Sequence, residues 1–144
     1  MDKTNNISLF AVSFKQGFIS PNVPIATFYQ GEKRLNFLLD TGSDKNVVNA
    51  KILNEIEHMP IETNGTKNTL TGVGGQQEVK IHNISFSCDG KKYTANFLAA
   101  DLTEAFGLIE NEHSIVLHGI IGSTFLREHK IVLDFTKLTA YSKS

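Results

Sequence analysis

Cysteine is almost absent from this sequence. Cys88 is the only cysteine among 144 residues, so the chain holds no internal disulfide framework. Small secreted domains commonly rely on several disulfides, and the near absence of cysteine therefore suits a reducing compartment.

Neither sign of charge is in excess. The 14 Lys and Arg residues nearly balance the 15 Asp and Glu residues, and the two kinds are interspersed without a basic block or stripe. Nucleic-acid binding depends on cations that neutralise a row of phosphates. We therefore expect no nucleic acid among the partners.

The N-terminus has no long apolar run. Residues 1–14 contain one lysine and a short apolar stretch interrupted by serines. This stretch is too weak for the apolar core of a secretory signal and too short to span a bilayer. We expect a cytoplasmic protein with no membrane partner.

Several motifs of catalytic and metal sites are also missing. The chain contains no His-Glu-x-x-His sequence, and one cysteine supplies no zinc framework. Ser123 lacks the Gly-x-Ser-x-Gly context, and no Walker loop is present, which argues against a serine hydrolase and a P-loop nucleotide site. We predict no metal and no other cofactor, and we interpret five histidines as structural or surface residues: His58, His82, His113, His118 and His129.

The length and the hydrophobic content of 40% predict one globular domain over residues 1–144, with a single core. Its pattern is that of a mainly β protein with about three short helices. We expect the helices at 50–57, capped by Asn49, at 103–112, and at 123–129. The second has capping-box spacing from Asp101 to Glu104 and one apolar stripe, and we interpret it as packing. The stripe consists of Leu102, Ala105, Phe106 and Ile109.

Alternating apolar residues and turn signals predict the strands. Two hairpins are expected, one joining 23–29 to 33–39 around Gly31 and one joining 84–88 to 92–99 around Asp89-Gly90. Other strands are expected at 7–14, 115–121, 130–135 and 138–141. The apolar alternation changes phase between Ile81 and Ile84, which predicts a β-bulge near His82 or Asn83.

The sequence FLLDTGSD, residues 37–44, takes an apolar strand directly into a carboxylate. Asp40 would lose solvation there, so its burial must be compensated by hydrogen bonds or used in chemistry. Thr41 offers a hydroxyl, and Gly42 can turn its N–H toward the carboxylate. For the tripeptide alone, an ordinary Asx-turn after a strand is the favoured interpretation.

Two further motifs follow in order. Residues 71–75, TGVGG, form a glycine-rich tip between extended polar stretches, and Ile120-Ile121-Gly122 precedes the third helix. Together with Asp40-Thr41-Gly42, this order resembles the retropepsins, the retroviral-type aspartic proteases. The resemblance covers about residues 23–141. It implies a closed β-barrel whose active site forms by homodimerisation, with a flap at about 66–82 and an N-terminal extension at 1–22.

The resemblance assigns roles to particular residues. Asp40 would be the catalytic acid and base, with Thr41 and Gly42 fixing its loop. The flap tip that folds over the peptide would be formed by Gly72, Val73, Gly74 and Gly75, with Val73 as its apolar contact. Further substrate-binding residues would be Ser43, Asp44 and Ile120.

The chemistry of this family uses two carboxylates that share a proton. Only one Asp-Thr-Gly is present, so the second carboxylate is expected to be Asp40 of another copy, which predicts a homodimer with one site on its two-fold axis. The expected activity is that of an aspartic endopeptidase acting on peptides or proteins. The alternative is a catalytically silent peptide-binding or dimerisation module with the same fold, which the intact Asp-Thr-Gly disfavours.

The chain departs from the viral pattern at several positions. The helix at 103–112 is the expected insertion. Ser123 stands where the viral enzymes have an arginine that pairs with the position of Asp44, and Arg127, one helical turn later, is the candidate substitute. Ser43 is expected to donate its hydroxyl to the Asp40 carboxylate, which would lower the apparent pKa of the dyad and favour an acidic optimum. The initial methionine predicts a free-standing protein.

Overall fold

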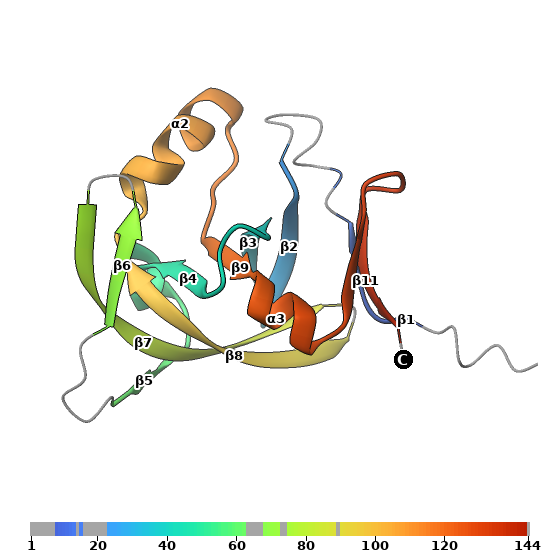
Figure 1. Cartoon of the computed structure of the whole chain (residues 1–144), viewed down its shortest axis with the longest axis horizontal. Coiled ribbons are helices and arrows are strands. Elements are labelled where there is room, and N and C mark those ends of the chain that lie inside the picture. Colours follow the sequence, from blue (N-terminus) through green and yellow to red (C-terminus); the bar gives the residue numbers. More distant parts are fainter. Residues whose placement is uncertain are drawn as a thin grey trace, which may run out of the picture.

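The computed structural model of the protein describes residues 8–13, 15, 23–62, 68–72, 75–88 and 90–143 (Figure 1). Most of the predicted extension at 1–22 lies outside these residues. The elements in chain order are β1 (Ser8–Ser13), β2 (Ile25–Gln30), β3 (Lys33–Asp40), β4 (Asn46–Asn49), the 3₁₀ helix η2 (Ala50–Glu55), β5 (Met59–Ile61), β6 (Asn68–Gly72), β7 (Gly75–Cys88), β8 (Lys91–Ala100), α2 (Thr103–His113), β9 (Gly119–Gly122), α3 (Ser123–Glu128), β10 (Ile131–Asp134) and β11 (Thr139–Lys143).

A closed barrel forms the main body of the chain. Its strands follow the order β2-β3-β9-β4-β8-β7, and Tyr29 of β2 pairs with Ser87 of β7, which closes the ring. β5 and β6 both pair with β7. The predicted mainly β fold with a closed barrel and a few short helices is confirmed. In the described ranges no helix is both long enough and apolar enough to cross a membrane.

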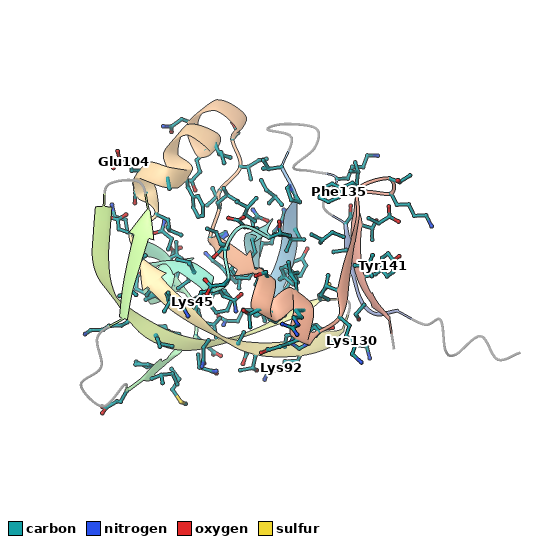
Figure 2. All side chains as sticks on the ribbon, viewed as in Figure 1. Lys45, Lys92, Glu104, Lys130, Phe135 and Tyr141 are labelled. Carbon is teal, nitrogen blue, oxygen red and sulfur yellow. The ribbon has the colours of Figure 1, made fainter. Side chains whose placement is uncertain are left out.

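A second, three-stranded sheet stands beside the barrel, in the order β1-β11-β10. Both pairings are antiparallel, so the beginning and the end of the described chain lie in one sheet. Phe135 lies at the turn between β10 and β11, and Tyr141 projects from β11 (Figure 2).

The apolar run before Asp40 is explained by two buried clusters, one on each side of β3. The first cluster consists of Ala26, Phe28, Leu35, Phe37, Leu39, Val48, Ile84, Phe86, Cys88, Phe97, Ile121, Phe125, Leu126 and Ala140. The second cluster consists of Ile25, Val47, Val79, Leu98, Ala100, Leu102, Phe106 and Leu117, and Leu38 packs against it. Because successive side chains of a strand point to opposite faces, both faces of β3 meet apolar neighbours.

The predicted β-bulge near His82 or Asn83 is absent from the described strand. β7 pairs with β8 in one uninterrupted register from Lys80 opposite Ala99 to Cys88 opposite Lys91. The phase of the sequence changes because the apolar neighbours of β7 change sides along its length. Val79 belongs to the second cluster, whereas Ile84 and Phe86 belong to the first.

Three further expectations differ from the structure. The first helix is a 3₁₀ helix that ends at Glu55, although Asn49 caps it as predicted by accepting from Lys51 N at 3.3 Å. The strand expected at 115–121 is limited to β9, at 119–122. The N-cap of α2 is Leu102 and makes no side-chain cap bond, so the helix does not begin as the capping-box spacing predicted. Asp101 Oδ1 nevertheless accepts from Thr103 N at 3.0 Å, at the start of the helix.

Candidate active site

Asp40 is the last residue of β3, and its carboxylate is held by the loop that follows. Gly42 N donates to Asp40 Oδ1 at 2.9 Å, as the sequence predicted, and Ser43 N donates to Asp40 O at 3.2 Å. A Cβ at position 42 would lie 3.1 Å from Oδ1, so glycine permits this approach. These contacts are those of an Asx-turn, and they orient the carboxylate at the end of the strand.

The Ile-Ile-Gly strand runs beside β3 and supports the same loop. β9 pairs in parallel with β3, which places Gly122 opposite Asp40. A Cβ at position 122 would lie 2.5 Å from Lys45 O and 2.7 Å from Ser43 O, so only glycine lets β9 approach the loop backbone this closely.

Three hydrogen bonds complete this support. Gly122 N donates to Asn46 Oδ1 at 2.9 Å, and Ser123 N donates to Ser43 O at 2.6 Å. The third bond corrects an expectation: Ser43 Oγ donates its one proton to Lys45 O at 2.7 Å, not to the Asp40 carboxylate. The hydroxyl therefore closes the loop on itself, and Ser43 gives no reason to expect an acidic optimum.

Arg127 does not replace the missing arginine. No ion pair joins it to Asp44, and the one ion pair found within the described ranges is Lys33–Glu55 at 3.1 Å. Asp44 is exposed. It lines a groove of about 460 Å³ that extends from the loop to α3, with Lys45, Asn46, Thr124 and Glu128 among the other lining residues. Figure 2 shows Lys45 near β4 and β8.

The predicted flap corresponds to the hairpin of β6 and β7. Gly72 pairs with Gly75 at its end, and the register extends back to Asn68 opposite Val79. Val73 and Gly74, the predicted tip, lie outside the described residues. The hairpin projects from the barrel on the same side as α2 in Figure 1.

Ile120, predicted to bind substrate, lies close to Asp40 in the sheet. It pairs with Leu38 of β3 and with Val47 of β4. Val47 is buried, whereas Leu38 and Ile120 are partly exposed. The structure thus brings an apolar surface to within two residues of the carboxylate along β3.

His118 has a structural role, as the sequence allowed, with a partner that the sequence did not indicate. Its ring Nδ1 accepts from Asn36 N at 3.0 Å, and its backbone N donates to Asn36 O at 2.9 Å. Burial, followed by the charge of Lys33, lowers the pKa of His118, while Glu55 acts in the opposite direction. The neutral imidazole therefore accepts the hydrogen bond of a strand N–H, a role that a backbone carbonyl ordinarily has.

Two other histidines contact each other away from Asp40. His58 Nδ1 and His82 Nδ1 are 2.9 Å apart, so one donates and the other accepts. Burial, followed by the charges of His58 and Lys80, lowers the pKa of His82. Across the described parts of the chain, no group of three or more His, Cys, Asp or Glu side chains is arranged to hold a metal ion.

Comparison with solved structures identifies a similar fold. The EIAV protease, solved in complex with the inhibitor HBY-793, matches with a TM-score of 0.50 and 22% sequence identity, over 76% of this chain and 89% of that protease. Neither the protein-family models nor the curated proteins give a match. At this identity the likeness concerns the fold alone, and the chain has a retropepsin-like fold.

Proposed function

We propose that the chain is an aspartic endopeptidase that acts as a homodimer, with Asp40 of each copy in one shared site. The observation that carries the proposal is the position of Asp40 in a retropepsin-like fold. Its carboxylate ends β3, is oriented by Gly42 N, and stands opposite Gly122 on a strand that supports the whole loop. Thr41 and Asp44 are exposed on this loop, where a second copy or a peptide has access to them.

In the proposed dimer, one Asp40 is ionised and the other holds a proton, because two adjacent carboxylates do not both ionise. The ionised carboxylate takes a proton from a water molecule whose oxygen bonds to the scissile carbonyl carbon. The protonated carboxylate gives its proton to the carbonyl oxygen, which yields a tetrahedral diol. When the C–N bond breaks, the nitrogen takes a proton from the first carboxylate and the diol returns one to the second, so the pair regains its initial state.

The substrate of this proposal is an extended peptide bound by strand-like hydrogen bonds under the hairpin of β6 and β7. Its contacts would come from Ser43, Asp44, Ile120, Gly72, Val73, Gly74 and Gly75. We treat residues 1–144 as one cytoplasmic domain that uses neither a metal nor another cofactor and binds no nucleic acid or membrane.

The test compares the wild type with Asp40→Asn on a diverse peptide mixture from pH 3 to 8, with products identified by mass spectrometry. Asp134→Asn is a matched control, because Asp134 also ends a strand and its Oδ1 accepts from Thr136 N at 2.9 Å and Lys137 N at 3.0 Å. Asparagine retains the acceptor oxygen in both turns but does not ionise. Sedimentation of the same samples measures the dimer.

We expect cleavage by the wild type and by Asp134→Asn, and none by Asp40→Asn. Cleavage that survives Asp40→Asn, or that is carried out by a monomer, would contradict the mechanism. If the wild type binds a statine-containing peptide but releases no product, the silent binding module is the better description.

A further inference from the structure

The chain between β8 and β9, residues 101–118, leaves the barrel beside β4 and rejoins it beside β3, three residues before the level of Asp40. β8 ends at Ala100, which pairs with Asn49 of β4, and β9 begins at Gly119, which pairs with Phe37 of β3. α2 is formed by this segment and stands on the same side of the barrel as the end of the β6–β7 hairpin (Figure 1). The segment is therefore positioned to border a peptide bound at Asp40.

Side-chain alternation determines which residues this segment meets. Leu39 and Ile121 belong to the first cluster, whereas Leu38 and Ile120 pack against the second. Leu38 and Ile120 are register partners and lie two residues before Asp40 and Gly122. Since both are partly exposed, they present apolar surface next to the candidate catalytic carboxylate.

α2 covers part of this same apolar face. Phe106 is 3% exposed and belongs to the second cluster. Ile109, one turn further along the helix, packs against the second cluster and remains partly exposed. The predicted packing stripe of α2 thus lies against the same cluster as Leu38 and Ile120. Ile109 is the residue of this stripe that packs there and stays partly exposed to solvent.

The segment is tied to the barrel on both sides of α2. Before the helix, Leu102 N donates to Asn49 Oδ1 at 3.3 Å. After it, Asn36 Nδ2 of β3 donates to Val116 O at 2.8 Å. Within the segment, Leu117 N donates to Glu110 Oε2 at 2.9 Å, which joins the helix to the chain that follows it. The two bonds to barrel strands favour a fixed wall over a mobile lid, because both would have to break for the segment to swing away.

We infer that α2 is the wall of an apolar subsite whose floor is Leu38 and Ile120, and that Ile109 determines which side chain of the peptide fits there. The inference rests on the proposed function for its link to cleavage. Since α2 already fills part of this face, the subsite takes a small aliphatic side chain, such as alanine or valine, beside the scissile bond. A larger aromatic side chain is excluded by Ile109.

Two variants change the wall in opposite directions. Ile109→Ala enlarges the subsite and Ile109→Phe reduces it. Ile52→Ala is the matched control, because Ile52 is also partly buried but packs against the first cluster, on η2. Each protein is tested on peptides with Ala, Val or Phe next to a central statine, with affinity measured by calorimetry. The cleavage sites in a peptide mixture are recorded in parallel, and thermal melts verify folding.

We expect Ile109→Ala to raise the Phe-to-Val affinity ratio by about 10-fold or more, the usual range when an apolar pocket gains or loses a few methylenes. Ile109→Phe should favour Ala, and Ile52→Ala should leave the ratio unchanged. A ratio that stays within about twofold of wild type in folded Ile109 variants overturns the inference, even if the wild type cleaves. If the wild type binds these peptides without cleaving them, the proposed function fails while a shifted ratio still supports the subsite. If the wild type binds none of them, both proposals fall.

Discussion

Gly122→Ala should disturb the candidate active site through the protein backbone alone. The added Cβ would lie 2.5 Å from Lys45 O, 2.7 Å from Ser43 O and 2.8 Å from Lys45 C. Ordinary C···O contacts are about 3.3 Å or longer, so the backbones must separate by roughly 0.8 Å. No side-chain rotation relieves this overlap, because all three atoms belong to the main chain.

The expected loss of stability has two sources. Overpacking of a close contact costs about 1–3 kcal/mol. Separation of β9 from the loop also weakens the hydrogen bond from Ser123 N to Ser43 O, which is worth about 0.5–1.5 kcal/mol. Together these effects lower the free energy of unfolding by about 1.5–4.5 kcal/mol. For a domain of this size, the melting temperature should fall by roughly 5–15 °C.

The assay is urea unfolding followed by circular dichroism, with m-values compared to verify that both proteins unfold in the same way. Gly107→Ala supplies the control, because it is the same substitution in α2 and a Cβ at position 107 would meet nothing within 4 Å. Alanine favours the helix, so this variant should gain up to about 1 kcal/mol. The reasoning would be refuted if Gly122→Ala were as stable as the wild type, since β9 would then not approach residues 43–45 as closely as described.

Two other predictions concern the rest of the domain. Burial lowers the pKa of His118 in the folded protein below the value of about 6.5 that histidine has in the unfolded chain. Below that pH the unfolded chain binds the proton more readily, so the stability of the fold should decline as the pH falls. This group contributes a slope of at most about 1.4 kcal/mol per pH unit. The stability of His118→Gln, measured by unfolding across pH 5–8, should therefore depend less steeply on pH. A dependence as steep as that of the wild type would contradict the role given to the bond from Asn36 N to Nδ1. Phe86→Ala, which removes a buried ring 5.2 Å from Phe28, should cost about 3–5 kcal/mol in urea unfolding, whereas Met59→Ala, with Met59 66% exposed, should stay within about 0.5 kcal/mol. Equal losses in these two variants would contradict the assignment of the first cluster.

Local features of the molecule were accessible from the sequence. The hairpin of β2 and β3 followed from Gly31, which has φ of 60°, and the contact from Gly42 N to Asp40 spans only two residues. Such features depend on the conformational preferences of a few adjacent residues, which the sequence states directly. The order of Asp-Thr-Gly, the glycine-rich tip and Ile-Ile-Gly added the fold through its resemblance to the retropepsins.

Contacts between distant residues were not accessible in the same way. Asn46 binds Gly122 and Asn36 binds His118, in pairs 76 and 82 residues apart, and nothing local in either sequence segment indicates the partner. Ser43 shows the same limit within one loop. Its hydroxyl has a choice of acceptors, and the path of the backbone toward Lys45 O decided between them.

The strand β7 shows most clearly how the sequence and the tertiary structure divide the information. Its alternating residues determined that it is a strand, and the change of phase after Ile81 recorded a real change in its surroundings. Only the fold decided that this change is a switch between two apolar clusters and not a bulge. In the same way, the apolar stripe of α2 specified a packed helix, but its neighbours were set by the route of the chain around the barrel. The spacing of apolar residues in the sequence shows which side of a helix or strand is buried. Which elements cover that side depends on residues far away along the chain.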